Sequence, residues 1–80
     1  MNHSRRYSMM IHWSDEDQAY LVMLPEWQDR LIGPAATHGD TYEQAARHGR
    51  EVLDMLIEDA LASGEPLPEP NVYPTAPARA

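Results

Sequence analysis

The residues of this 80-residue chain that could hold a metal ion or move a proton are thirteen carboxylates and four histidines. Three of the acids are adjacent, in the run Asp15-Glu16-Asp17. A hard cation needs several oxygen ligands that converge from separated positions. Three consecutive side chains in a short turn point in different directions and stay hydrated. The run therefore predicts a solvated turn and not a metal site.

The other residue types with reactive side chains are also too scattered to indicate an active site. None of the histidines has a second histidine or an acid at a spacing that matches a metalloenzyme motif. No serine lies in a G-x-S-x-G turn, and no glycine-rich phosphate loop is present. The absence of cysteine excludes a thiolate zinc site and a thiol nucleophile. We therefore predict no catalytic residue, no metal ion, no cofactor and no enzymatic activity.

Composition favours one small, acidic domain. The net charge is −7, and all six basic residues are arginines. This balance disfavours binding to a nucleic-acid backbone, and no apolar run is long enough to span a membrane. No export signal begins the chain, so we expect a cytoplasmic protein. Leu, Ile and Val are few and Phe is absent, which favours a domain that gains part of its stability from a partner.

Residues 7–13 and 19–24 are predicted to form a β-hairpin with a polar turn at residues 14–18. The first segment alternates apolar and polar side chains, and Pro25 ends the second. The second strand is apolar on both faces, so one face is free to meet a second copy of the chain. The positions expected to face the helix are Tyr7, Met9, Ile11, Trp13, Leu21 and Met23. The outward positions, predicted to mediate self-association, are Met10, His12, Tyr20, Val22 and Leu24.

A single helix is predicted between two sets of end signals. Asp40 and Thr41 are good N-terminal caps, each followed by Glu or Gln three residues later, and Gly64 is a typical C-terminal cap. Gly49 lies inside the apolar stripe, where we expect a strand to approach closely. The residues expected on that stripe are Tyr42, Ala45, Ala46, Gly49, Val52, Leu53, Leu56 and Ala60.

The remaining segments complete an α+β fold. Residues 25–33 form a connection, and a short third strand is expected within residues 31–38, limited by Pro34. Residues 65–70 are stiff and extended because prolines alternate there, and residues 71–73 offer an optional fourth strand. We therefore predict a β-β-β-α-β order, with three antiparallel strands and one helix on a face. The domain is expected at residues 7–73, between a loose N-terminus at 1–6 and a Pro/Ala-rich tail at 74–80.

Two features favour binding to another protein. The outer face of the predicted helix is acidic and is expected to steer a basic partner. Trp27 lies in the connection after the second strand, where we expect it to be an exposed hydrophobic anchor. The predicted partner-binding residues are Trp27, Glu51, Asp54, Glu58 and Asp59.

Three motifs, in this order and spacing, resemble the HicB antitoxin family. They are an aromatic strand that runs into Pro25-Glu26 (residues 20–27), a Gly39-Asp40-Thr41 helix start with Glu43 and Ala45, and Gly64-Glu65 followed by Pro68 and Pro70. The resemblance covers residues 7–73 and implies a truncated ribonuclease-H-like fold. It also implies neutralisation of a small basic HicA-type toxin, an RNA-cleaving protein, by covering its RNA-binding surface. Family members self-associate through this domain, which implies a homo-dimer or a higher homo-oligomer.

The chain departs from the family pattern in two ways. Its connection at residues 28–34 is longer than in many members, and it ends at Ala80 without the C-terminal DNA-binding segment that full-length members carry. We therefore expect no direct DNA binding. Two alternatives stay open, namely an orphan homo-oligomeric module with a non-toxin partner and a metal-dependent nuclease remnant. The nuclease chemistry requires several converging acids, and the predicted helix-facing strand positions include none.

Overall fold

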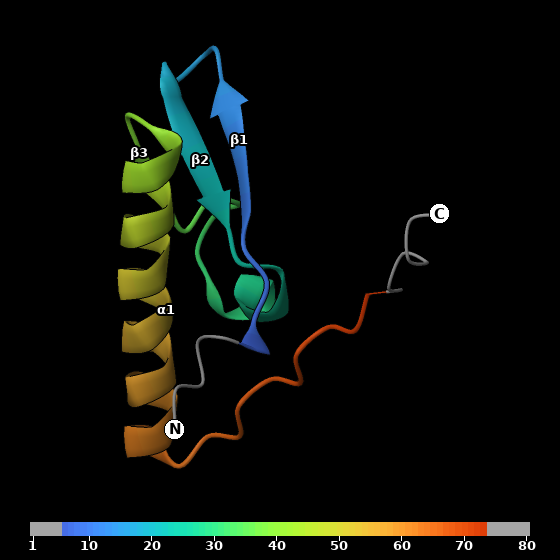
Figure 1. Ribbon diagram of the computed structural model, residues 1–80. Coiled ribbons are helices and arrows are strands. Elements are labelled where there is room, and N and C mark those ends of the chain that lie inside the picture. The colour runs from blue at the N-terminus through green and yellow to red at the C-terminus, as the bar shows by residue number, and fades with distance from the viewer. Residues whose placement is uncertain (1–5, 74–80) are drawn as a thin grey trace.

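A three-stranded antiparallel sheet with one helix across a single face forms most of residues 6–73, which are the residues that the computed structural model describes (Figure 1). The elements are β1 (Met10–Ser14), β2 (Ala19–Met23), a 3-10 helix η2 (Pro25–Arg30), β3 (Thr37–Gly39) and α1 (Tyr42–Ser63). The predicted α+β class is thus confirmed. The expectations for residues 1–5 and for the tail at 74–80 lie outside the described residues.

The β1–β2 hairpin has its register set by a turn of four residues, 15–18. The Ser14 hydroxyl donates to the Asp17 carboxylate over 2.8 Å, and Gln18 adopts a positive φ of 53° that lets the chain reverse. Ser14 then lies opposite Ala19, and Ile11 lies opposite Val22. Directly opposed residues of an antiparallel pair share a face of the sheet, so Ile11 and Val22 point the same way.

This register reverses the predicted faces of β2. Val22 and Leu24 are completely buried and Tyr20 is half-buried, so the prediction that these three residues face outward is wrong. Leu21 lies opposite His12, and Met23 lies opposite Met10. The prediction failed because a strand that is apolar on both faces does not indicate which face the helix covers. The even number of turn residues decides this instead, because it sets which residues of β1 and β2 lie opposite one another.

Helix α1 begins and ends at the predicted caps. The Thr41 side-chain oxygen accepts a hydrogen bond from the Gln44 backbone N–H, and Gly64 closes the helix in the left-handed conformation with φ 74°. The buried helix positions are Ala45, Gly49, Leu53, Ile57 and Ala60. Tyr42 was predicted on this face but is 60% exposed, although its ring lies 4.3 Å from that of Tyr20 between centroids. No helix within residues 6–73 combines the length and the apolar character needed to cross a membrane.

The sheet approaches α1 most closely at two glycines. A Cβ added at Gly49 would lie 2.8 Å from Met9 Sδ and 2.9 Å from Val22 Cγ1, as the close approach predicted for this position requires. A Cβ at Gly39 would meet the backbone of the helix itself, with Ala45 Cα at 2.7 Å. Both glycines therefore set the distance between the helix and the sheet.

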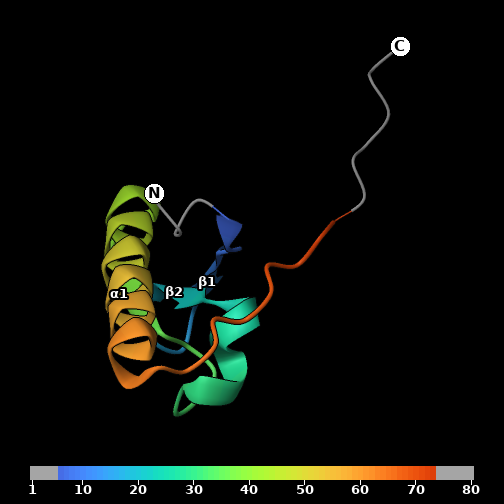
Figure 2. The ribbon, with the colours of Figure 1, turned by 90° about the horizontal axis from the view of Figure 1, so that it is seen from below.

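The segments outside the hairpin and the helix differ in part from expectation. The third strand lies at residues 37–39, at the end of the predicted window. The Ala36 N–H donates to the Val22 carbonyl over 2.7 Å, just before the strand begins. Residues 65–73 form no strand, so the optional fourth strand is absent from the described part of the chain. They run as an extended strap past η2 (Figures 1 and 2).

Alanine at the two glycines is predicted to destabilise the fold to different degrees. Gly39→Ala forces backbone against backbone and should lower the free energy of unfolding by about 3 kcal/mol. Gly49→Ala meets side-chain ends that can shift, and it gains helix propensity, so the net loss should be about 1 kcal/mol. Urea unfolding followed by circular dichroism measures both. A larger loss for Gly49→Ala than for Gly39→Ala would contradict this packing.

Candidate interaction surfaces

The acidic helix surface, which consists of Glu51, Asp54, Glu58 and Asp59, is exposed along α1. Glu51, Asp54 and Glu58 follow one another at intervals of three and four residues, so they are neighbours on one side of the helix. The last turn of α1 contains no basic residue that would favour the negative end of the helix dipole. Among residues 6–73, the ion pair joins Arg30 to Glu65 at 3.7 Å and involves none of these four acids.

The opposite side of the molecule presents the outer sheet face, which consists of Met10, His12, Leu21, Met23 and His38. His12, Leu21 and His38 form one row across the three strands, because Leu21 lies opposite both histidines. Met10 is 51% exposed. None of these strand positions carries an acid or an arginine. In a chain with a net charge of −7, another copy can approach these strand positions with little acid-to-acid repulsion, although Asp17 of the turn lies on the same side.

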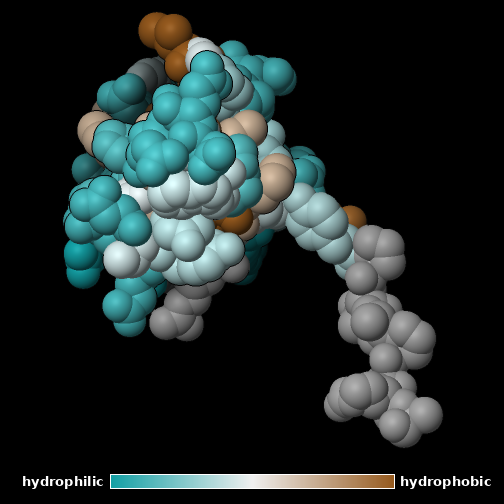
Figure 3. Space-filling view, turned by 90° about the horizontal axis from the view of Figure 1, so that it is seen from above, coloured by the Kyte–Doolittle hydropathy of each residue, from teal (hydrophilic) through white to brown (hydrophobic). Residues whose placement is uncertain are grey.

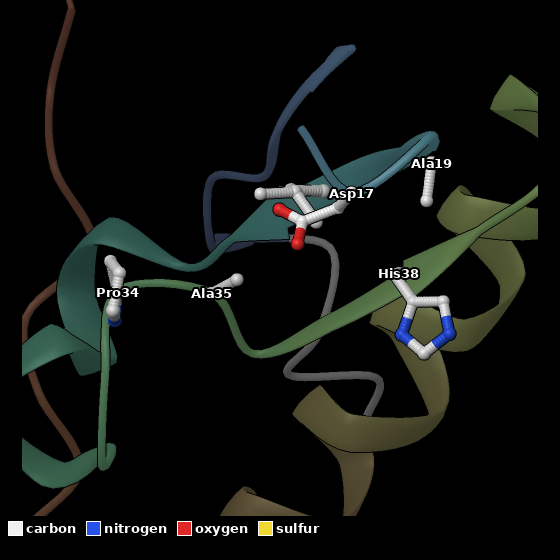
Figure 4. Close-up of a pocket in the computed structure, with 6 residues that line it drawn as sticks. Asp17, Ala19, Pro34, Ala35 and His38 are labelled. Atoms are coloured by element: carbon white, nitrogen blue, oxygen red, sulfur yellow. The ribbon is translucent and has the colours of Figure 1, made fainter. Parts of the chain in front are cut away.

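A shallow hollow of about 470 Å³ opens on the same side (Figure 4). Ala19 and Leu21 of β2, Pro34 and Ala35 of the following loop, Asp17 of the turn and His38 of β3 line it. Its apolar lining continues the outer sheet face toward the loop.

Two of the three adjacent acids of the turn have hydrogen-bond partners. Asp15 accepts a hydrogen bond from the Trp13 indole N–H over 3.2 Å, and Asp17 pairs with Ser14 as described above. Within residues 6–73, no group of three or more His, Cys, Asp or Glu side chains is arranged to hold a metal ion.

An aromatic row lies at the end of the molecule where α1 begins. The ring of Tyr20 stacks 5.1 Å from Trp13 and 4.3 Å from Tyr42, measured between centroids. Figure 3 looks down on this end, where hydrophilic side chains surround a paler area. The row joins the hairpin to the first turn of α1, and its ring contacts cover part of the surface of two exposed aromatic residues, Trp13 and Tyr42.

Trp27 is buried, with 1% of its surface exposed, and the prediction of an exposed anchor is wrong. The Tyr7 ring packs edge-on against it at 5.4 Å, and the Arg30 guanidinium carbon lies 5.0 Å from its ring centroid. The indole N–H has no hydrogen-bond partner among the described residues. Trp27 is surrounded by polar residues in sequence, and the contacts that bury it come from other parts of the chain.

Glu26 connects three separate segments. Its carboxylate accepts hydrogen bonds from the Ser8 N–H at 3.0 Å, the Ser8 hydroxyl at 2.8 Å and the Asn71 N–H at 2.8 Å. Burial disfavours the charged carboxylate, but these hydrogen bonds outweigh it and hold the pKa of Glu26 below its usual value. Burial, together with the nearby Glu26 charge, raises the pKa of Tyr7, so its hydroxyl stays protonated.

Sequence reasoning missed the place where the strap binds. The Tyr7 hydroxyl donates to the Pro68 carbonyl and the Arg30 guanidinium donates to the Pro66 carbonyl, each over 2.7 Å. The alternating prolines indicated that the segment is stiff. The residues that bind it lie about 35 to 60 positions away in the sequence. The signal that the sequence did contain was a proline-rich segment in a chain that also has aromatic residues able to bind one.

Comparisons of the chain with models of protein families, with curated proteins and with solved structures give no match. The resemblance to the HicB family therefore stays a prediction that rests on the motifs.

Glutamine at position 26 is predicted to remove part of the acid sensitivity of the fold. A carboxyl group with a lowered pKa in the folded state stabilises the fold above its unfolded pKa, about 4.3 for Glu. That stabilisation is lost as the pH falls through the folded value. Glu26→Gln should therefore cost about 1 kcal/mol near pH 7 and flatten the acid limb of the stability curve.

Urea unfolding between about pH 7 and pH 3 tests this, with Glu16→Gln in the exposed turn as the charge-matched control. Identical pH profiles for Glu26→Gln and the control would show that Glu26 does not hold the segments together.

Proposed function

We propose that this chain is a non-catalytic binding protein of the HicB antitoxin type, working in the cytoplasm. Its acidic helix surface binds the cationic surface of a small, basic HicA-type toxin. Because the toxin binds RNA with that surface, the contact neutralises the toxin. Such a carboxylate surface competes with phosphates for the same arginines and lysines. The proposal includes no contact of this chain with DNA.

This proposal rests on the three like charges of Glu51, Asp54 and Glu58, which are neighbours on one side of α1. Like charges at intervals of three or four residues cost a helix about 0.2–0.5 kcal/mol per pair. No ion pair shorter than that of Arg30 and Glu65 involves these acids within residues 6–73. Arg47 and Arg50 lie four residues before Glu51 and Asp54 and offset part of this cost, whereas Glu58 has no basic residue four positions before it. Departures from local stability rules concentrate at functional sites, and a cationic partner would turn this cost into binding energy.

The order of the family-like motifs gives further support. Residues 20–27 supply β2 and the start of η2, residues 38–45 supply β3 and the helix cap, and residues 64–70 supply the C-terminal cap and the strap. All three motifs therefore belong to the described α+β unit, which presents the acidic helix surface on the side away from the sheet.

Neutralising Glu51, Asp54 and Glu58 is predicted to weaken partner binding without destabilising the fold. The triple variant Glu51→Gln, Asp54→Asn, Glu58→Gln should bind the partner at least about tenfold less tightly at low salt. Its stability should rise by about 0.5 kcal/mol because like-charge repulsion is relieved. The partner to use is the small, basic product of the reading frame adjacent to that of this chain. The measurements are its affinity and the inhibition of its RNA cleavage.

The matched control is Asp15→Asn, Glu16→Gln, Asp17→Asn, which removes the same charge from the hairpin turn. Equal loss of affinity in both variants would make the effect one of net charge and would contradict the proposed surface. An adjacent frame without a basic RNA-cleaving product would contradict the antitoxin role.

The outer sheet face favours a second candidate function, a homo-oligomeric module whose partner is not a toxin. Of the residues first predicted to mediate self-association, Met10 and His12 lie on this face, whereas Tyr20, Val22 and Leu24 face the helix. The proposed contact surface is therefore the row around Leu21, with Met10 and Met23. Its lack of charge suits an isologous dimer, in which each patch meets its own copy.

A charge placed in this row is predicted to prevent self-association. Leu21→Asp would bury an unpaired carboxylate in the interface, so the chain should run as a monomer in multi-angle light scattering at micromolar concentration. Met55→Asp is the matched control, because Met55 is exposed on α1. A wild-type chain that is already a monomer, or a dimer that Leu21→Asp leaves intact, would contradict this surface.

A further inference from the structure

The strap, residues 65–73, has its backbone conformation imposed by its prolines. Pro66, Pro68 and Pro70 alternate with Glu65, Leu67 and Glu69. Proline fixes its own φ near −65° and excludes the helical region for the residue before it. Every residue from 65 to 70 is therefore confined to extended or polyproline II geometry. A segment of this kind loses little conformational entropy when it binds.

Tyr7 and Arg30 hydrogen-bond to the strap, and Trp27, which packs against both, lines a hollow with Arg30 and Glu65; these three residues, Tyr7, Trp27 and Arg30, are called the groove below. Tyr7 precedes β1, and the other two residues belong to η2, alongside which the strap runs in both views (Figures 1 and 2). The Tyr7 hydroxyl and the Arg30 guanidinium donate to the carbonyls of Pro68 and Pro66. These carbonyls lie two residues apart, which matches the repeat of the prolines.

The groove recognises the backbone of the strap more than its side chains. The polar contacts from Tyr7, Arg30 and Glu26 reach two carbonyls and the N–H of Asn71. Leu67 adds an apolar contact with the core, and Glu65 adds the ion pair with Arg30. An aromatic surface with donors aimed at the carbonyls of a polyproline II segment is the general way in which proteins bind proline-rich peptides.

The strap is joined to α1 at Gly64, where the N–H groups of Gly64 and Glu65 donate to the Leu61 and Ala60 carbonyls. Gly64 has a φ of 74° and ends the helix, and nothing lies within 4 Å of the position a Cβ would occupy there. Beyond this glycine, the hydrogen bonds and the ion pair described above hold the strap, and most of its residues are exposed. Its release would leave α1 and the sheet contacts in place.

We propose that the groove of Tyr7, Trp27 and Arg30 is a recognition site for proline-rich segments in polyproline II conformation, which residues 65–71 occupy from within the same chain. A Pro-x-Pro-x-Pro segment presented in trans binds the same groove when the internal segment leaves it. Asp59 of the acidic helix surface lines a hollow together with Trp27 and Arg30, so the two surfaces adjoin. The antitoxin proposal can still fail while this one holds, because binding of a proline-rich peptide is measured without any toxin.

The experiment uses the full chain and a fluorescein-labelled peptide of residues 65–73. The internal segment competes at a high effective concentration, so the wild type should bind the peptide weakly. The variant Pro66→Gly, Pro68→Gly, Pro70→Gly loosens the internal segment and should bind at least about tenfold more tightly in fluorescence anisotropy. A labelled peptide with the same three prolines replaced by glycine is the control and should not bind.

The groove itself is tested by adding Tyr7→Phe to the loosened variant. Loss of one hydrogen bond should weaken peptide binding by about fivefold. Tyr42→Phe is the matched control, since Tyr42 lies at the other end of the fold and should leave the affinity unchanged. Equal affinities with and without Tyr7→Phe, or equal binding of the proline-free peptide, would overturn the proposal.

A second measurement keeps the proposal testable if the glycine variant fails to fold. In the ¹⁵N-labelled wild-type chain, unlabelled peptide at millimolar concentration should displace part of the internal segment and shift the Leu67 and Glu69 amide resonances toward their unbound positions, while the Trp13 indole resonance stays in place. Unchanged Leu67 and Glu69 resonances at saturating peptide would overturn the proposal.

Discussion

The antiparallel register of the β1–β2 hairpin is the constraint on which the rest of the structure depends. The turn at residues 15–18 sets Ser14 opposite Ala19, and every later pair follows from that match. Because Ile11 shares a face with Val22, the helix covers Val22 and Leu24, and Gly49 lets α1 come close enough to bury them. A shift by one residue would exchange the covered and open faces of β2. The outer sheet face is thus the direct consequence of an even turn length.

The same constraint separates the surfaces on which the proposals rest. The helix lies on one side of the sheet (Figure 2), so its acids and the outer sheet face point in opposite directions. A basic partner on α1 and a second copy on the sheet can therefore bind together. The strap binds at a third place, where Glu26 ties the segment before β1 to the segment after α1. A domain of this size gains from such ties, since its core consists of few large aliphatic residues.

Features of the fold that depend on neighbouring residues could be predicted from the sequence. Features that depend on contacts between distant segments could not. Thr41, Gly49 and Gly64 each act through neighbours within a turn or through the helical stripe, and all three behave as predicted. The phase of β2 needed the pairing with β1, which a doubly apolar strand does not reveal. Trp27 was expected to be exposed because it lies in the connection after the second strand, yet it belongs to the core cluster with residues of α1 and contacts the Tyr7 ring. Of the predicted partner-binding residues, the four helix acids are exposed as expected and Trp27 is not.

The proposal that the acidic helix surface receives the partner is tested most directly by residue-specific mapping of the complex. A uniformly ¹⁵N-labelled chain, titrated with the small, basic product of the adjacent reading frame, reports which amides change their environment. The proposed arrangement predicts shifts or broadening at Glu51, Asp54, Glu58 and Asp59 that disappear at high salt, while Leu21 and Met23 stay unchanged. Perturbation confined to β2, or no perturbation at all, would contradict it.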